Sequence, residues 1–375
     1  MQVVLGPRQV GKTTMIRQVL QDLTIANQFF SADMAAGSQS AWIARQWQTA
    51  RVIMQAQHLQ EYVIVFDEIQ KIPQWSEAVK KEWDADTFSG VNIKVVLLGS
   101  SRVLIEKGLG ESMAGRFEQI RMTHWTYPEM HEAFGFSLDQ WLYFGGYPGT
   151  ASLIGDEDRF CSYINGAIID ATINKDILLD SPVSKPALLR QTFELGCLYS
   201  GEILSLTKLL GQLQDSGNTT TLSGYLQRLS DSGLLCGLQK YGNDASRRRA
   251  SVPKFQVYNN ALNTAVKQLD FDGVRQKPDV WGRIAESGIG AYLASQSFSR
   301  RFELYYWREK SWEVDFVMKY RGRTIALEIK TNNESRSKGL EVFQEKFHPY
   351  GAYIIGSAGI PFETFLTMDL LALIA

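Results

Sequence analysis

The amino-acid sequence predicts a multidomain α/β protein whose N-terminal part is built on a parallel sheet. The first observation is a strand-like apolar run, Val3–Leu5, followed by Gly6–Thr13 and then by apolar residues at helical spacing. The second is Tyr62–Phe66, a continuous apolar run of the kind that is buried on both faces of a parallel sheet. The third is length, because 375 residues exceed one ordinary core. About two to four domains are therefore expected.

The segment after the first strand has the spacing of a loop that cradles phosphates. The pattern G-x-x-x-x-G-K-[ST] is met by Gly6, Pro7, Arg8, Gln9, Val10, Gly11, Lys12 and Thr13, with Thr14 after them. Glycines let backbone N–H groups turn inward around an anion, and a helix starting near Lys12 directs its positive end to the same place. Lys12 is expected to reach the β- and γ-phosphates, and the Thr13 hydroxyl to bind Mg²⁺. The alternative is a chance Gly-rich turn, which the flanking strand and helix disfavour. The segment is predicted to bind ATP.

Composition limits the class of protein and its partners. The net charge of −1 gives no general attraction to nucleic acid, so any such contact has to come from local patches. Three widely spaced cysteines indicate buried thiols in a reducing compartment, and the four histidines lack the spacing of metal ligands. Neither a signal peptide nor a membrane-spanning run is visible in the sequence. We therefore expect a cytoplasmic protein without a membrane partner.

Two acidic residues, Asp67 and Glu68, follow the apolar run at 62–66. At the carboxyl end of a strand beside the phosphate loop, Asp67 can hold the Mg²⁺ shell, and Glu68 can polarise the attacking water as general base. The alternative is an acidic cap on a buried strand. A further strand over 93–98 is expected to lie between the strand that precedes the phosphate loop and the strand that ends at Asp67 and Glu68. Its end would bring Ser100 or Ser101 to the γ-phosphate as a sensor, and a plain turn explains these serines equally well.

An arginine precedes the fifth predicted strand, Phe117–Met122. Arg116 is a candidate finger that neutralises charge in the transition state, acting in cis or from a neighbouring subunit of a homo-oligomer. A structural salt bridge explains Arg116 at least as well.

These parts together resemble the AAA+ ATPases. The match is to a prokaryotic group in which an AAA-type ATPase precedes a poorly characterised C-terminal region. The resemblance is carried by the phosphate loop, Phe66–Trp75, Leu98–Ser101, Ala114–Arg116 and Phe144–Pro148. It covers nearly the whole chain and implies an ATPase that uses ATP and Mg²⁺. The chain begins almost on its first strand, where such proteins carry about a helix or two more.

The core predicted from this pattern spans residues 1–125, and the next segment, 126–186, has helical periodicity. Helices are expected over Leu138–Phe144 and Phe160–Leu179. This segment would form a lid that closes over the nucleotide. The glycines Gly145 and Gly146 punctuate it as an expected hinge.

Residues 187–262 have the order helix, turn, helix and two strands, which is that of a winged helix, and the group that the chain resembles has such a domain here. The residues predicted to face a DNA groove are Thr219, Thr220, Ser223 and Arg228. Arg247–Arg249, in the loop between the two strands, are predicted to contact DNA phosphates. Eight basic against five acidic residues over 187–260 give a net charge of +3. Docking of a protein partner is an equal alternative.

Residues 280–375 carry a second chemical pattern. Two predicted strands flank Arg321–Arg323; the first places Val314, Phe316 and Met318 on one face and Asp315 on the other. The second strand places Glu328 and Lys330 on one face. In register, Asp315, Glu328 and Lys330 would converge, with Glu286 as a fourth member, and could bind Mg²⁺ and activate water against a phosphodiester. The pattern resembles the PD-(D/E)xK nuclease fold of restriction enzymes. The alternative is a degenerate nuclease-like fold that keeps its charges for structure or docking.

The full prediction is a P-loop NTPase sheet with a helical lid, a winged helix and a restriction-endonuclease-like α/β domain. Its function would be Mg²⁺-dependent ATP hydrolysis coupled to DNA and to metal-dependent cleavage. The alternative function is a slow ATP-dependent switch that binds DNA or protein and cuts nothing. A weaker alternative is an ATPase that acts on protein partners through the winged helix.

Overall fold

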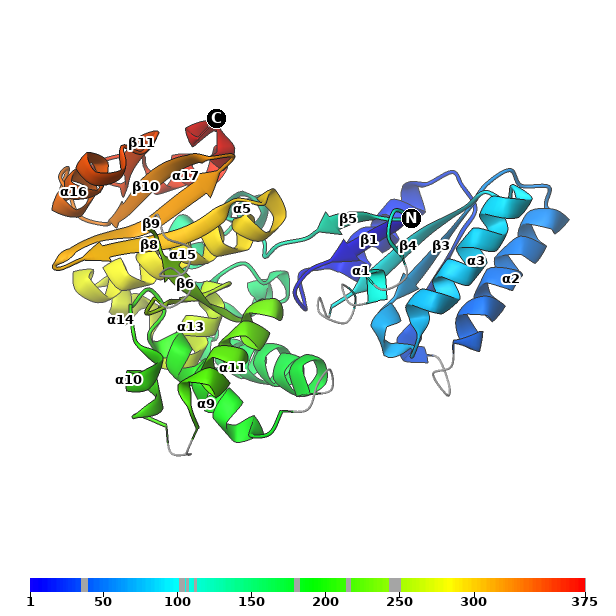
Figure 1. The fold of residues 1–375 in the computed structure, drawn as a ribbon, viewed down its shortest axis with the longest axis horizontal. Coiled ribbons are helices and arrows are strands. Elements are labelled where there is room, and N and C mark those ends of the chain that lie inside the picture. Colours follow the sequence, from blue (N-terminus) through cyan, green and yellow to red (C-terminus); the bar gives the residue numbers. More distant parts are fainter. Residues whose placement is uncertain are drawn as a thin grey trace. The chain divides into compact units, whose positions relative to one another are not determined.

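The computed structural model describes residues 1–34, 40–100, 105, 108–110, 113–178, 183–213, 217–242 and 251–374. Its contacts divide the chain into two compact units, Met1–Met122 and Thr123–Ala375 (Figure 1).

The first unit is built on a parallel sheet with the strand order β2-β3-β4-β1-β5. The strands are β1 (Gln2–Leu5), β2 (Asn27–Ser31), β3 (Tyr62–Asp67), β4 (Ile93–Gly99) and β5 (Glu118–Arg121). Every residue of β3 is buried, as expected for a strand covered on both faces. The strands β3, β4 and β1 are parallel neighbours, with β4 in the middle. The loops that follow their carboxyl ends therefore lie together at one edge of the sheet.

Helices cover both faces of this sheet. They are α1 (Lys12–Asp22), α2 (Ala41–Ala56) and α3 (Trp75–Ser89), with short 3₁₀ turns over Ala32–Met34 and Ile69–Lys71. Trp47 of α2 and Val79 of α3 pack with Phe66 on one face. Ile16 of α1 packs with Val63 and Val65 on the other face. Figure 1 shows α2 and α3 side by side on the sheet.

The second unit contains a six-stranded mixed sheet with the order β11-β10-β9-β8-β6-β7. Its strands are β6 (Leu235–Lys240), β7 (Lys254–Val257), β8 (Glu303–Glu309), β9 (Trp312–Tyr320), β10 (Arg323–Lys330) and β11 (Gly351–Gly356). Strand β6 pairs antiparallel with β7 and parallel with β8, through Gln239 and Lys240. The two strands expected in the winged helix and the strands expected in the nuclease-like fold therefore share one sheet.

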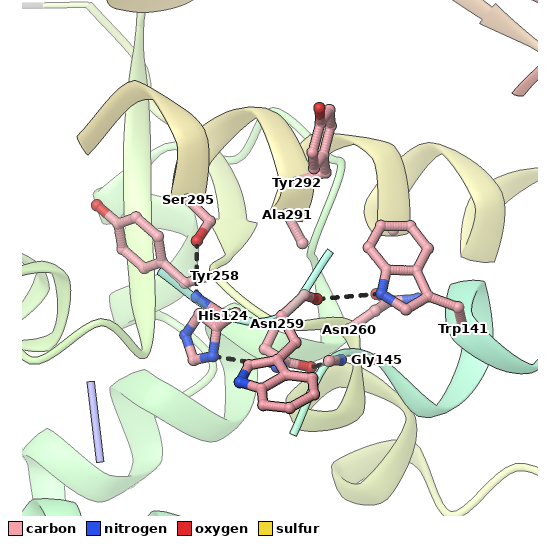
Figure 2. Close-up of a pocket in the computed structure, with 12 residues that line it drawn as sticks. His124, Trp141, Gly145, Tyr258, Asn259, Asn260, Ala291, Tyr292 and Ser295 are labelled. Atoms are coloured by element: carbon pink, nitrogen blue, oxygen red, sulfur yellow. Dashed lines mark hydrogen bonds between the residues drawn. The ribbon is translucent and has the colours of Figure 1, made fainter. Parts of the chain in front are cut away.

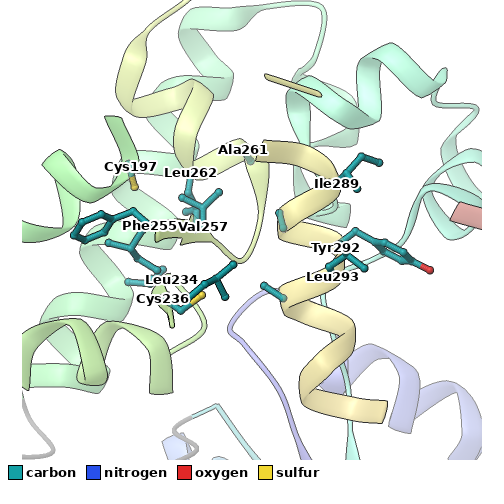
Figure 3. Packing of buried hydrophobic residues seen from close by; sticks show 14 of the residues in the cluster. Cys197, Leu234, Cys236, Phe255, Val257, Ala261, Leu262, Ile289, Tyr292 and Leu293 are labelled. Carbon is teal, nitrogen blue, oxygen red and sulfur yellow. The ribbon is translucent and has the colours of Figure 1, made fainter. Parts of the chain in front are cut away.

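Helices surround this sheet and form the largest core of the protein. They are α5 (Tyr127–Phe134), α6 (Leu138–Phe144), α7 (Glu157–Tyr163), α9 (Pro186–Leu198), α10 (Leu206–Leu210), α11 (Thr219–Asp231), α13 (Asn260–Lys267), α14 (Phe271–Arg275), α15 (Pro278–Arg300), α16 (Lys338–Phe347) and α17 (Phe362–Thr367). Short 3₁₀ turns span Pro148–Leu153 and Leu370–Leu373, and π-helical stretches span Ile164–Asp170 and Ile173–Ile177. Figure 3 shows residues of α9, β6, β7, α13 and α15 packed in this core.

The segment predicted as a lid, 126–186, packs within the second unit. Helix α6 contacts α13 and α15, and α7 contacts α13. Trp141 and Phe144 of α6 are buried in the same core as Ile289 of α15. Closure of this segment over a nucleotide stays a prediction.

The glycine pair expected as a hinge is instead a point of close packing. Figure 2 shows Gly145 next to Asn259. A Cβ atom on Gly145 would lie 1.9 Å from Asn259 Oδ1, and one on Gly146 would lie 1.9 Å from the carbonyl oxygen of Trp125. Asn259 accepts a hydrogen bond from the Gly146 N–H and also contacts the ring of His124. These contacts fix the pair against α13, so its glycines serve packing rather than bending.

Candidate functional site

The phosphate loop predicted from the sequence leads directly into a helix. Helix α1 begins at Lys12, and its N-cap residue Gly11 has φ 89°, a conformation that favours glycine. In the described part of the chain, α1 has no side-chain cap and no acidic residue in its first turn. Its N-terminal end therefore suits a phosphate. Gly6 is also required sterically, because a Cβ there would lie 2.7 Å from the carbonyl oxygen of Met122.

Lys12 is folded onto its own loop. Its Nζ donates to the carbonyl oxygens of Gly6 at 2.9 Å and Pro7 at 2.7 Å, and the residue is 7% exposed. A buried ammonium needs such partners. Phosphate oxygens would be stronger partners for the same cation, so the lysine is placed where a phosphate can recruit it.

Thr13 and Asp67 lie together, as a shared Mg²⁺ shell requires. Thr13 Oγ1 donates to Asp67 Oδ2 at 2.9 Å, and the Glu68 N–H donates to Asp67 Oδ1 at 3.0 Å. Burial and the neighbouring Glu68 charge raise the pKa of Asp67. Oxygen donors of this kind are those that Mg²⁺ prefers, and a divalent cation would offset both causes of the raised pKa. The donor set therefore fits Mg²⁺.

Glu68 is held at the end of β3 by two polar side chains. Ser100 Oγ donates to Glu68 Oε2 at 3.0 Å, and Gln70 Nε2 donates to the same oxygen at 2.6 Å. Glu68 itself has φ 53°, a left-handed conformation that is uncommon for a non-glycine residue. The structure thus brings Ser100 to the position expected of it, and its role as a phosphate sensor stays a prediction. Ser101 lies outside the described residues.

Gln70 is a member of this site that the sequence analysis missed. Its Nε2 lies 3.4 Å from Ser100 Oγ, so it joins the ends of β3 and β4. The only signal was its place two residues after Glu68. A short 3₁₀ turn, Ile69–Lys71, folds the side chain back onto that carboxylate.

Arg116 forms a salt bridge instead of approaching the phosphate loop. Its guanidinium donates to both carboxylate oxygens of Asp84 on α3, at 2.8 and 3.1 Å. Because β5 runs parallel to β1, Arg116 lies before the amino end of its strand, whereas the loop follows the carboxyl end of β1. The geometry therefore supports the structural alternative within one chain. A role in a neighbouring subunit stays a prediction.

The face predicted for Val314 at the start of β9 is wrong. Tyr305 pairs with Val317 and Trp307 pairs with Val314, so two steps along β8 match three along β9. This is a β-bulge. As a result Val314 and Val317 pack against α16, whereas Phe316 and Met318 pack on the opposite face with α15.

The bulge places Asp315 where β9 separates from β10. The Ile329 N–H donates to Asp315 Oδ2 at 2.8 Å, beyond the last backbone pair Phe316–Leu327. Lys330 Nζ lies 3.5 Å from Glu328 Oε1. Burial and the charge of Asp315 raise the pKa of Glu328 to about 8. Asp315, Glu328 and Lys330 are thus neighbours, as the sequence indicated.

Glu286 of α15 belongs to the same group. Burial and the Asp315 charge raise its pKa to about 7. Its carboxylate lies 2.7 Å from Nζ of Lys254. Sequence analysis missed this lysine, which entered it only as one of the eight basic residues of 187–260. Over the described residues, however, no three histidine, cysteine or acidic side chains are placed to hold a metal ion as they stand.

The predicted DNA-reading residues lie on α11. Thr219, Thr220 and Ser223 are exposed, while Arg228 is partly buried. Asn218 caps the helix by accepting a hydrogen bond from the Thr221 N–H at 2.7 Å. Arg247–Arg249 lie outside the described residues. Within the described ranges, no helix is long and apolar enough to cross a membrane.

The strand order, the phosphate loop and the acidic pair define the first unit as a P-loop NTPase fold. Residues 1–131, which include the whole first unit, match the family model described as an AAA domain. Residues 135–273 and 281–361 match two families described as domains of unknown function, DUF8612 and DUF4143.

Curated relatives are uncharacterized proteins. Rv2008c of Mycobacterium tuberculosis is 24% identical over 344 residues, covering 90% of this chain and 72% of the relative. MJ1544 of Methanocaldococcus jannaschii is 24% identical over 277 residues, covering 68% of this chain and 58% of the relative.

Two solved structures are among those to which the chain is similar. The Aeropyrum pernix ORC2 protein, with ADPNP and ADP, is 13% identical with a TM-score of 0.42, covering 79% of this chain and 88% of that chain. A Thermotoga maritima RuvB variant is 15% identical with a TM-score of 0.33, and the match covers 63% of this chain and 81% of that chain.

Proposed function

We propose that the first unit binds ATP with Mg²⁺ and hydrolyses it. The observation that carries this proposal is the continuous contact from Thr13 through Asp67 and Glu68 to Ser100, at the ends of β1, β3 and β4. Backbone N–H groups of 8–13 would hold the phosphates, and Lys12 would exchange its carbonyl partners for phosphate oxygens.

Each residue of this contact has a role in hydrolysis. Thr13 and Asp67 would hold Mg²⁺, which when bound neutralises charge on the phosphates. Glu68 would orient a water whose oxygen bonds to the γ-phosphorus as the β–γ bridging bond breaks, and would accept the proton of that water. Gln70 and Ser100 would keep the Glu68 carboxylate aimed at that water.

Two substitutions test this assignment. Lys12→Ala should abolish nucleotide binding, measured by calorimetry. Glu68→Gln keeps the size of the side chain and loses its basicity, so it should retain binding and lose turnover. Normal turnover in Glu68→Gln would remove Glu68 from the role of general base.

We further propose that the second unit binds DNA through α11 and that the nucleotide state of the first unit controls this binding. Support comes from the exposed Thr219, Thr220 and Ser223 on one helix and from the net charge of +3 over 187–260. The alternative is docking of a protein partner on the same surface. Phosphate contacts release counterions, whereas a protein interface depends less on salt.

The test is the salt dependence of duplex DNA binding by the full chain, measured by fluorescence anisotropy. The affinity for DNA should fall steeply as the salt concentration rises. A triple variant, Thr219→Ala with Thr220→Ala and Ser223→Ala, should bind DNA more weakly than the wild type. Thr87→Ala, an exposed threonine of the first unit, is the matched control. Binding that is insensitive to salt would favour a protein partner. Control by nucleotide is tested by comparing the DNA affinity of Glu68→Gln in the presence of ATP with that of the same variant without nucleotide.

Metal-dependent DNA cleavage is a second candidate function. It is favoured by the gathering of Asp315, Glu328 and Lys330 at the fork between β9 and β10. Cleavage with Mg²⁺ or Mn²⁺ that is lost in Lys330→Ala would support it. Intact duplex, branched and single-stranded DNA would favour a switch that binds without cutting.

A further inference from the structure

A buried lysine lies among the carboxylates of the nuclease-like site. Lys254 is the first residue of β7, and its side chain is 0% exposed. Its Nζ lies 2.7 Å from Glu286 Oε1, 3.4 Å from Glu313 Oε1 and 3.6 Å from Asp315 Oδ1. These carboxylates come from α15 and β9, so one ammonium joins three separate elements of the unit.

The surroundings of Lys254 favour its charged form. Besides the carboxylates, Nζ lies 3.4 Å from the carbonyl oxygen of Asp315 and 5.0 Å from the centre of the Phe316 ring. A buried ammonium is stable when it has such partners, and three carboxylates surround this one. The lysine is therefore a cation at neutral pH.

The same group contains an acceptor without a donor. Glu328 is 9% exposed, and among the described residues its Oε2 is buried with no hydrogen-bond partner. Lys330 approaches only the other oxygen, Oε1, at 3.5 Å. The two lysines of the site, Lys254 and Lys330, therefore leave this oxygen without a donor.

We propose that Lys254 Nζ fills the cation position of this carboxylate site, so that a tethered ammonium stands where a nuclease of this fold holds a divalent metal. Mg²⁺ requires oxygens at about 2.0–2.1 Å. An ion bound to both Glu286 and Asp315 would lie within a few ångströms of Nζ, and repulsion between the two cations would exclude one of them. The site is thus closed to metal while β7 keeps its place.

The proposal concerns the second unit alone and does not depend on ATP hydrolysis. It sets the condition for the second candidate function, because metal-dependent cleavage requires Lys254 to leave. Since β7 belongs to the predicted winged helix, that segment would control access to the carboxylates.

The test is Mn²⁺ binding to the full chain, followed by the electron paramagnetic resonance of free Mn²⁺ at about pH 8 without nucleotide. The parent is Asp67→Asn, which removes the carboxylate of the ATP site. The parent should bind no Mn²⁺ in the second unit, and adding Lys254→Met should create a site for about one Mn²⁺ per chain, because carboxylate oxygens suit this ion. Adding Asp315→Asn to that variant should abolish the new site.

Two outcomes would overturn the proposal. One is Mn²⁺ binding by the parent that Asp315→Asn removes, since Lys254 would then not exclude metal. The other is a folded Lys254→Met variant that gains no Mn²⁺. If this variant does not fold in metal-free buffer, Mn²⁺ during refolding must restore it, and failure to restore it also counts against the proposal. Lys254→Met with Glu286→Gln removes one cation and one carboxylate together, and should fold without binding Mn²⁺.

Discussion

The Thr13 hydroxyl donates a hydrogen bond of 2.9 Å to Asp67, a residue 54 positions away in the sequence. The contact joins the loop after β1 to the end of β3, and it fixes both oxygens at the distance that a shared ligand needs. Removing the hydroxyl would leave Asp67 buried with one donor fewer. Thr13→Val should therefore weaken ATP binding in the presence of Mg²⁺ by about tenfold or more, about 1.4 kcal/mol.

Calorimetric titration with and without Mg²⁺ measures this effect. Thr13→Ser retains the hydroxyl and is the matched control, with affinity near that of the wild type. Equal affinity of Thr13→Val and the wild type in Mg²⁺ would show that the hydroxyl is not a ligand.

Gln70 should affect turnover more than binding. Its Nε2 donates to the Glu68 carboxylate at 2.6 Å and does not lie on the phosphate loop. Gln70→Leu keeps the size of the side chain and frees the carboxylate to move, so kcat should fall by about tenfold with little change in ATP affinity. Gln55→Leu, the same change at an exposed position of α2, is the control. A Gln70→Leu variant with normal kcat would mean that Ser100 alone is enough to position Glu68.

Arg116 and Asp84 should behave as one pair. Both are partly buried, and the guanidinium makes two hydrogen bonds to the carboxylate. If the pair is only structural, Arg116→Ala and Asp84→Ala should give the same ATPase rate at every protein concentration. A fall in turnover in Arg116→Ala alone, growing with protein concentration, would instead identify a finger that acts in a neighbouring subunit.

The sequence was sufficient to predict the first unit because its determinants are local. A strand, a glycine loop and a helix are adjacent in the chain, and the acidic pair directly follows a buried strand. The position of Ser100 also followed, once β4 was expected between β3 and β1. Gln70 was missed because its function depends on how a single 3₁₀ turn folds it back, which periodicity does not reveal.

In the second unit the decisive contacts are long-range. The bulge in β9 moves Val314 to the opposite face of the sheet. The alternation of apolar and polar residues in the sequence does not reveal where such an extra residue is inserted. Lys254 is 61 positions from Asp315, and β7 comes to the carboxylates by packing on α15, which no local pattern of residues reveals. Gly145 and Gly146 read as a hinge because glycine spacing alone does not distinguish bending from close packing.

The stability of the second unit should fall as pH rises, because the pKa of Glu328 is raised to about 8 from an ordinary value of 4.5. Its carboxylate faces Asp315, Lys330 and Lys254, and burial is the largest cause of the shift. The folded state therefore binds an extra proton between these two pH values. This contribution is fully present below about pH 4.5 and is lost as pH rises through about 8.

Glutamine mimics the protonated acid, so Glu328→Gln should flatten the dependence. Urea unfolding from about pH 5 to about pH 8.5 should show the wild type losing on the order of 2 kcal/mol relative to the variant. Curves that run parallel over this range would mean that Glu328 titrates alike in the folded and unfolded chains.

Gly146 should be among the least replaceable residues of the second unit. A Cβ there would lie 1.9 Å from the carbonyl oxygen of Trp125, which is backbone and cannot rotate away. The Trp125 N–H also donates to the Gly146 carbonyl oxygen at 3.1 Å, so the two segments cannot move apart without losing that hydrogen bond. Gly146→Ala should therefore destabilise the second unit by about 3 kcal/mol or more. Gly155→Ala is the control, because nothing lies within 4 Å of a Cβ at that exposed position. Hydrogen exchange resolved by peptide separates the units: protection should fall across α13 and α15 in Gly146→Ala and stay unchanged in β1, β3 and β4. Equal protection of the two variants would mean that the chain at Trp125 yields more easily than its packing indicates.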